Sequence, residues 1–316
     1  TCQYDIEVVD NQDPSITCAT PAASYNADAG ECYYTVPDNG LDPVSTDDNC
    51  GVASVTNDFN AGASLNGAQF PVGTTTVIWT VTDVNGRTNT CQYDIEVVDN
   101  QDPSITCPGA LTTQCDISDI PPYADYAAFI AAGGSASDNC GIDAASFTHV
   151  SDVSDNNTCP ETVTRTYQIS DINGNTSTCQ QTIIIDDTTD PTVTAPDDYT
   201  IEGCDTGDIT DFAYNETETT ITLGGYLGLT GALASDNCGI ATVTYQDSEA
   251  GSCPTTVTRT WRITDDCGNT TTVTQTITID DTTDPTVTAP DDYTIEGCDT
   301  GDITDFAYNE TETTIT

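Results

Sequence analysis

The sequence predicts an all-β chain built from β-sandwich repeats arranged end to end. Three observations lead to this prediction. The chain repeats itself, its apolar residues alternate with polar ones over short stretches, and its turns are rich in Asp, Asn, Pro and Gly. With 316 residues, the chain is long enough for two or three ordinary domains.

The repeat is marked by an Asp-Pro hinge that recurs at Pro14, Pro103, Pro191 and Pro285. A spacing of about 90 residues suits one small sandwich. Residues 1–18 are identical to residues 90–107, and residues 185–222 are identical to residues 279–316. We therefore predict five segments: the last strand of a preceding repeat (1–10), three whole repeats (11–101, 102–189 and 190–283, the last with a longer insert), and the start of a following repeat (284–316).

The clearest strand is the stretch TVIWTVTD, in which Val77, Trp79 and Val81 alternate with Thr and Ile. This period of two is typical of a half-buried strand. The equivalent inward positions in the later repeats are Tyr167, Ile169, Trp261 and Ile263. A short helix is predicted over residues 126–132, where two glycines stop it. The form of the insert at residues 212–234 stays open.

The charge balance excludes several classes of partner. Asp and Glu number 52 against 4 basic residues, all arginine, so the net charge is −48. Nucleic acid and anionic membranes both need clustered cations, so neither is expected as a partner. The charge favours cations: calcium, or simply salt. No apolar run is long enough for membrane insertion.

No enzyme signature is present, and we predict that the chain is not an enzyme and has no catalytic residue. Carboxylate pairs abound, but they lie in repeated turns, where catalysis would have to be triplicated. Arg165 and Arg259 occupy matching strand positions, and each is expected to pair with a neighbouring carboxylate.

Fifteen cysteines at recurring places indicate disulfides and an oxidising, extracellular location. Four cysteines in one repeat allow three connectivities. We expect bridges that close within each repeat, and expect Cys115 to be free and Cys2 and Cys298 to have partners outside these residues. The preferred pairs are Cys18–Cys32, Cys50–Cys91, Cys107–Cys179, Cys140–Cys159, Cys204–Cys267 and Cys238–Cys253.

The stretches DPSITCPGALTTQCD, SDNCG and TRTYQISDINGNTSTC are similar to the hyalin-repeat (HYR)-like modules. The resemblance covers essentially the whole chain. It implies tandem immunoglobulin-like β-sandwich repeats arranged end to end, and related repeats fill giant surface adhesins of bacteria. Because such modules serve many proteins, the resemblance implies architecture more than function.

In an immunoglobulin-like sandwich, three places lie at one end: the start of the first strand, the loop between the second and third strands, and the loop between the last two. The acidic hinges, the Asp-Asn-Cys loops and the Asp-containing turns should therefore converge at each junction. Carboxylate and amide oxygens suit structural calcium. The predicted ligands are Asp10, Asp13, Asp48, Asp83, Asn85, Asp99, Asp102, Asp138, Asp171, Asn173, Asp186, Asp187, Asp190, Asp236, Asp265, Asp266, Asp280, Asp281 and Asp284. The alternative is a solvated acidic turn, with no bound metal.

We predict a structural segment of an extracellular filament or adhesin stalk, at the cell surface or secreted, with calcium-stiffened junctions. Its expected partners are the neighbouring repeats of the same chain, other copies in a filament, or surface glycans. The alternative function is a glycan- or surface-binding module whose repeats hold the ligand directly. A stalk predicts interchangeable repeats, whereas a binding module predicts one repeat that retains affinity alone.

Overall fold

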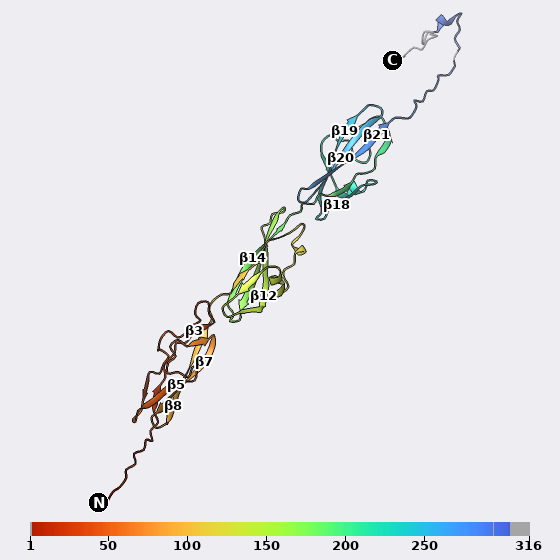
Figure 1. The fold of residues 1–316 in the computed structure, drawn as a ribbon. Coiled ribbons are helices and arrows are strands. Elements are labelled where there is room, and N and C mark those ends of the chain that lie inside the picture. Colours follow the sequence, from red (N-terminus) through yellow and green to blue (C-terminus); the bar gives the residue numbers. More distant parts are fainter. Residues whose placement is uncertain (1, 293, 304–316) are drawn as a thin grey trace.

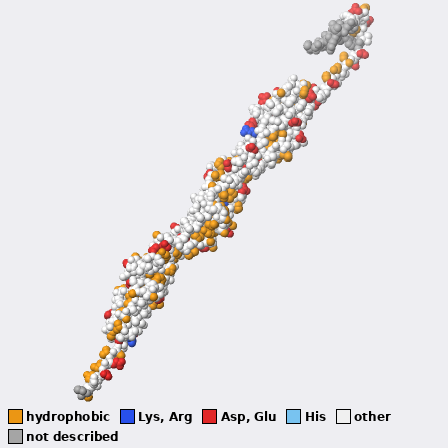
Figure 2. All heavy atoms as spheres, in the orientation of Figure 1, with side chains coloured by type: hydrophobic (Ala, Val, Ile, Leu, Met, Phe, Trp, Pro, Cys, Tyr) orange, Lys and Arg blue, Asp and Glu red, His pale blue; other side chains and the backbone are white. Residues whose placement is uncertain are grey.

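The computed structural model describes residues 2–292 and 294–303. Three β-sandwiches follow one another in chain order along an extended rod (Figure 1). The predicted fold class is confirmed: all-β, with tandem immunoglobulin-like sandwiches arranged end to end. Asp and Glu side chains are scattered along the visible face of the whole rod (Figure 2).

The first sandwich has one large sheet, of strand order β2-β8-β7-β5, and two smaller sheets, β1-β4 and β3-β6. Strand β2 runs parallel to β8, and the other pairs are antiparallel. The strands are β1 (Ser15–Thr17), β2 (Tyr25–Asn26), β3 (Tyr33–Thr35), β4 (Ser45–Asp47), β5 (Val52–Asn57), β6 (Gln69–Pro71), β7 (Gly73–Asp83) and β8 (Thr88–Val98).

The second sandwich has the large sheet β10-β14-β13-β12 and the small sheet β9-β11. Its elements are β9 (Ser104–Thr106), β10 (Leu111–Thr113), the 3-10 turn η1 (Ile117–Asp119), α1 (Tyr126–Ala131), β11 (Ser135–Ser137), β12 (Ile142–Ser154), β13 (Glu161–Asp171) and β14 (Thr176–Ile185). The predicted short helix is confirmed as α1, whose first turn is capped by the Asp125 side chain and which buries Phe129. Glycine is needed just after it, because a Cβ at Gly134 would lie 2.4 Å from the Phe129 ring.

The third sandwich has the five-stranded sheet β16-β21-β20-β19-β17 and the small sheet β15-β18. The insert, left open by the sequence, forms β17, α2 and β18. The elements are β15 (Thr192–Thr194), β16 (Tyr199–Glu202), η2 (Thr206–Asp208), β17 (Thr219–Ile221), α2 (Leu223–Leu227), β18 (Leu233–Ser235), β19 (Ile240–Ala250), β20 (Thr255–Asp265) and β21 (Thr270–Asp280), with η3 (Thr300–Asp302) in the segment that follows.

The central strand of each sandwich buries every second side chain, as predicted. In β7, Val77, Trp79 and Val81 are fully buried. Tyr167, Ile169, Trp261 and Ile263 are fully buried as well. Successive side chains of a strand point to opposite faces, so the intervening threonines face away from this core. Each large apolar side chain buried in this way stabilises its sandwich by about 1.5–3 kcal/mol.

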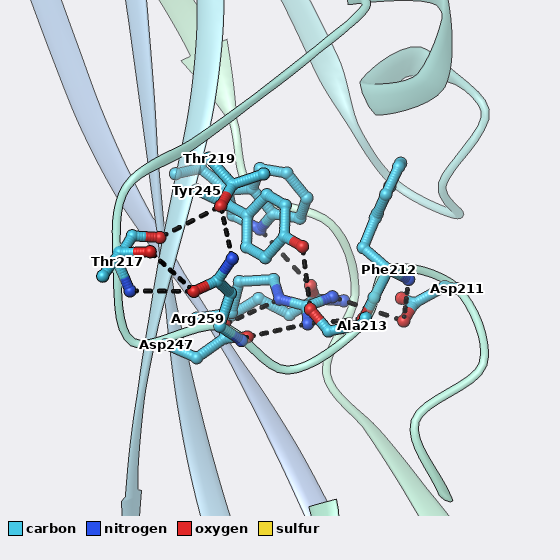
Figure 3. A network of polar contacts seen from close by, with 11 residues as sticks. Asp211, Phe212, Ala213, Thr217, Thr219, Tyr245, Asp247 and Arg259 are labelled. Atoms are coloured by element: carbon cyan, nitrogen blue, oxygen red, sulfur yellow. Dashed lines mark hydrogen bonds and ion pairs between the residues drawn. The ribbon is translucent and has the colours of Figure 1, made fainter. Parts of the chain in front are cut away.

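Two arginines are buried among these apolar residues, and both pair with carboxylates as predicted. Arg165 donates from Nε and Nη2 to the two oxygens of Asp152, each at 2.8 Å. In the third sandwich, Arg259 donates to both oxygens of Asp247, at 2.8 and 2.9 Å, and to the carbonyl of Phe212 (Figure 3). Since Phe212 belongs to the insert, Arg259 ties the start of the insert to the sheet.

The expectation that every bridge closes within one repeat is wrong. Two disulfides do so: Cys18–Cys91, and Cys107–Cys179, which was predicted. Three others join neighbouring sandwiches: Cys32–Cys140, Cys115–Cys238 and Cys159–Cys267.

The expectation failed in part because three of its pairs, Cys140–Cys159, Cys204–Cys267 and Cys238–Cys253, join cysteines that lie at opposite ends of one sandwich. Cys115 follows β10 at the far end of the second sandwich, where it meets the loop of Cys238 in the third. The expectation of a free Cys115 is therefore wrong too, as are the pairs Cys18–Cys32, Cys50–Cys91, Cys140–Cys159, Cys204–Cys267 and Cys238–Cys253.

Candidate metal centres at the sandwich junctions

Three loops meet where one sandwich follows another. We call the contact between the first and second sandwiches the first junction, and that between the second and third the second junction. The proximal face of each sandwich, which points toward the preceding part of the described chain, carries the hinge, the Asp-Asn-Cys loop and the turn that follows the central strand. The opposite end of each sandwich is its distal end. At the first junction, for example, Asn173 of the turn donates to Asp99 of the hinge at 3.0 Å.

The Asp-Asn-Cys-Gly loop is built around its aspartate. One oxygen of Asp138 accepts the backbone N–H groups of Cys140 and Gly141, at 2.8 and 3.2 Å. Asp48 and Asp236 make the same pair of contacts. Gly141 has a φ of 112°, a conformation that favours glycine, so the motif recurs as a unit. The second oxygen of each aspartate takes no part in these bonds.

The turn aspartates Asp83, Asp171 and Asp265 are buried and act mainly as turn formers. Asp171 accepts the backbone N–H groups of Asn173, Gly174 and Asn175 at 2.6–2.9 Å. The Asn175 amide occupies its other oxygen at 2.7 Å. These contacts explain the recurrence of the Asp-x-Asn-Gly turn without any metal.

The hinge aspartates are those four residues before each hinge proline. Asp10, Asp99 and Asp187 each accept the backbone N–H of the residue two positions later, at 3.0–3.1 Å. Asn85 also donates to Asp10, at 2.7 Å, and this bond together with the Gln12 N–H lowers the pKa of the Asp10 carboxyl. Each hinge is thus a hydrogen-bonded turn, and in the first hinge the hydrogen bonds favour the charged form of Asp10.

Among the described residues, hinge and loop aspartates come together in three clusters, each with a cysteine that was not among the predicted ligands. In each cluster the ligand atoms lie within 4.8 Å of one another. The clusters are Asp10, Asp48 and Cys50; Asp99, Asp138 and Cys140; and Asp187, Asp236 and Cys238. Cys140 and Cys238 are oxidised in disulfides, so only the carboxylates of those two clusters remain as ligands for a hard cation.

Several carboxylate oxygens in these faces are buried without a hydrogen-bond partner. Of the five such side-chain atoms found among the described residues, four belong to predicted ligands: Asp48 Oδ1, Asp83 Oδ2, Asp187 Oδ2 and Asp236 Oδ1. Asp187 is itself only 3% exposed. A buried charged oxygen without a partner is costly, so the positions of Asp48, Asp187 and Asp236, which also lie in the clusters, suit a cation.

Other predicted ligands are used differently. Asp13 pairs with Arg87 at 2.8 Å, while Asn85 and Asn173 turn their amide nitrogens, not their oxygens, to the hinge carboxylates. Within residues 2–292 and 294–303, no cluster brings in Asp102, Asp186, Asp190, Asp266, Asp280, Asp281 or Asp284. Asp281 accepts the Thr283 N–H in a turn like those of the other hinges.

The HYR domain matches residues 9–97, and the HYR-like domain with 4 cysteines matches residues 228–279. The chain therefore contains HYR-like modules at these residues. Such modules are extracellular and of the adhesion type, and they are typically non-enzymatic. The five disulfides agree with an extracellular location.

Among solved structures, the chain is similar to protocadherin gammaB7 EC3-6 in a cis-dimer structure, with 11% identity, 84% of this chain and 77% of that chain covered, and a TM-score of 0.28. It is also similar to human CDH23 EC21-23, with 13% identity, 84% and 100% coverage and a TM-score of 0.30. TM-scores of this size carry no weight for function. No curated protein matches the chain. Within the described residues, no helix is long and apolar enough to cross a membrane.

Proposed function

We propose that the chain is a segment of an extracellular filament or adhesin stalk, with the repeats bounded as predicted (11–101, 102–189 and 190–283), and that structural calcium stiffens its junctions. One observation carries the proposal: Asp187 Oδ2 and Asp236 Oδ1 are buried without a partner where the hinge and the loop meet. Two carboxylates from different loops, held together by one ion, would resist bending at that point.

The donor chemistry fits calcium better than a softer metal. The disulfide sulfurs are not thiolates, so the ligand atoms left in the cluster at the second junction are the carboxylate oxygens of Asp187 and Asp236. Two carboxylates leave several of the six to eight positions around calcium for water or backbone oxygens. Such a site suits affinities of about 10⁻⁴–10⁻³ M, the range of extracellular modules.

Calorimetric titration with calcium and small-angle X-ray scattering of the oxidised chain test the proposal. The double variant Asp187→Asn, Asp236→Asn should lower calcium affinity at the second junction about tenfold or more, since it removes two ligand charges. The matched control is Asp291→Asn, Asp292→Asn, which changes the charge equally at two exposed positions.

In scattering, chelator should broaden the distance distribution of the parent chain, and added calcium should restore it. If calcium binds equally well to the double variant and the control, the acidic residues serve solvation and the proposed metal joint is wrong. If one isolated repeat retains affinity for a surface glycan, the chain is a binding module instead.

A further inference from the structure

Three cysteines of the sandwiches stay unbonded although their counterparts in neighbouring sandwiches are bonded. Cys50 on the proximal face of the first sandwich corresponds to Cys140 and Cys238 in the Asp-Asn-Cys loops. At the distal end of the third sandwich, Cys204 and Cys253 are exposed thiols. Their counterparts in the second sandwich, Cys115 and Cys159, bond to the third sandwich.

The correspondence at Cys204 extends to the local structure. Cys115 and Cys204 each follow a strand that runs parallel to the last strand of the sheet, β10 and β16. Each is followed by an aspartate whose side chain caps a 3-10 turn. Cys204 Sγ lies 4.0 Å from Asp281 Oδ2, beside the next hinge, so the thiol is already in the position that Cys115 holds beside the second junction.

Cys253 matches Cys159 in the same way. Each precedes a proline in the hairpin that leads into the central strand, between β19 and β20 and between β12 and β13 respectively. Cys159 reaches Cys267, in the turn of the following sandwich, with a Cα–Cα distance of 5.3 Å. The distal end of the third sandwich therefore repeats both cysteine positions of the distal end of the second.

We propose that the distal face of the third sandwich is an open covalent docking face for a further repeat of the third type. Cys204 bonds to the cysteine of that repeat's Asp-Asn-Cys loop, and Cys253 bonds to the cysteine of its Asp-Asp-Cys-Gly turn. Cys50 bonds to the counterpart of Cys32, which is the distal cysteine of a sandwich of the first type. Every junction of the rod is then cross-linked, so load passes between sandwiches through disulfides as well as through the hinge.

The occupant is indicated by the chain's own sequence. Residues 279–316 are identical to residues 185–222, so the segment after the third sandwich has the same sequence as the opening of that sandwich. A sandwich of this type presents Cys238 and Cys267 on its proximal face, which are the two positions that Cys115 and Cys159 bond. The two distal cysteines match these two proximal cysteines in number and position. This match favours a neighbouring repeat over an unrelated thiol as the bonding partner.

Bond formation needs a two-electron oxidant, which we take to be a low-molecular-weight disulfide such as glutathione disulfide. One cysteine loses its proton and its thiolate attacks the oxidant, releasing one small thiolate and leaving a mixed disulfide. The second cysteine loses its proton and attacks the mixed disulfide, releasing the other small thiolate. The two protons and two electrons of the cysteines end on the reduced small thiol.

The experiment extends the chain with its own sequence. Adding residues 223–283 after Thr316 completes a copy of the third sandwich, because residues 284–316 already repeat 190–222. The extended chain is refolded in a glutathione redox buffer, alkylated, digested without reduction and mapped by mass spectrometry. We expect Cys204 and Cys253 to lose alkylation and to be found bonded to the added counterparts of Cys238 and Cys267.

A matched variant carries serine at the added counterpart of Cys238, and in it Cys204 should regain alkylation while Cys253 stays protected. Fluorescence of the added counterpart of Trp261 reports whether the added sandwich folds. The proposal is overturned if the added sandwich folds while Cys204 and Cys253 remain alkylated, bond to each other, or bond between two chains.

The proximal end provides an independent test should the added sandwich not fold. Placing residues 11–89 before Thr1 completes a copy of the first sandwich, because residues 1–18 repeat 90–107. Cys50 should then bond to the added counterpart of Cys32, and Cys2 to the added counterpart of Cys18. An alkylated Cys50 in that chain overturns the proposal. Both mappings are done in chelator, so their outcome is independent of calcium.

Discussion

The two junctions differ in what crosses them, and one residue position accounts for much of the difference. At the first junction, one disulfide, Cys32–Cys140, joins the sandwiches, and Asn173 in the turn donates to Asp99 Oδ2. At the second junction, the position of Asn173 is occupied by Cys267, which bonds to Cys159 and adds a second disulfide.

The exchange of an amide for a bridge changes the electrostatics of the hinge. Asp99 has an amide donor for Oδ2, whereas Asp187 Oδ2 has none and is buried without a partner. The first junction therefore has one disulfide and a hydrogen-bonded Asp99 Oδ2, and the second has two disulfides and an Asp187 Oδ2 without a partner. The second junction gains covalent stiffness and also becomes the better candidate for a cation.

The largest expected effect comes from removing the single bridge of the first junction. Cys32→Ser, Cys140→Ser leaves only hydrogen bonds there, and loss of a bridge worth about 2–4 kcal/mol should raise the open population of that junction about 30-fold or more. Cys115→Ser, Cys238→Ser should have little effect, since Cys159–Cys267 remains. Small-angle X-ray scattering in chelator measures the distance distribution of both double variants. Equal broadening of the two distributions would contradict the difference between the junctions.

A smaller effect follows from giving the second junction the turn residue of the first. Cys267→Asn with Cys159→Ser supplies an amide to Asp187 Oδ2, and calcium affinity there should fall about tenfold, because a hydrogen bond to a charged group is worth about 1.5–3 kcal/mol. The control, Cys267→Ser with Cys159→Ser, loses the same bridge without gaining the amide. Calorimetry should separate the two variants, and equal affinities would show that the amide is irrelevant.

The reverse change at the first junction should have an effect of similar or smaller size. Asn173→Ala removes the amide from Asp99 Oδ2 and leaves Asn139, whose amide donates to the Glu31 carbonyl at 2.8 Å across the junction. Calcium affinity at the first junction should rise by up to about tenfold. Unchanged calcium binding, with unchanged folding by circular dichroism, would argue against a cation at Asp99.

The smallest effect concerns pH at the hinges that leave the second and third sandwiches. Gln114 accepts the Thr189 hydroxyl at 2.7 Å, whereas Glu202 accepts the Thr283 hydroxyl, also at 2.7 Å, and the N–H and hydroxyl of Thr282. The bonds from Thr283 and Thr282 lower the pKa of Glu202 to about 2.

Because the folded-state pKa of Glu202 is lowered, its ionised carboxylate stabilises the hinge above the ordinary pKa of 4.5. This stabilisation is lost as the pH falls toward 2. The protection of the Thr282 amide, measured relative to the intrinsic exchange rate at each pH, should therefore fall over that range, whereas the protection of Thr189 beside the neutral Gln114 should not respond through this group. Glu202→Gln should remove the pH dependence at Thr282 while keeping most of its protection. If amide exchange at Thr282 still depends on pH through a carboxyl in that variant, the group responsible is not Glu202.

Much of the fold could be predicted because its signals are local. The alternation around Trp79, the glycine after α1 and the Asp-Asn-Cys-Gly loop depend on neighbours only a few residues away. The location of the candidate site could also be predicted, because the topology of the sandwich brings the hinge, the loop and the turn to one end. The roles of Asn85 and Asn173 were not predictable, because the direction of an amide depends on the carboxylate that it meets.

By itself, the sequence determined the all-β class, the repeat length, the inward residues of the central strands and the acidity of the hinges. Only the tertiary structure decided the cysteine pairing. Cys32 and Cys140 are separated by 108 residues and belong to different sandwiches, yet their Cα atoms lie 4.8 Å apart. Such a pair depends on how two sandwiches stack, and neither local pattern nor repeat counting carries that information.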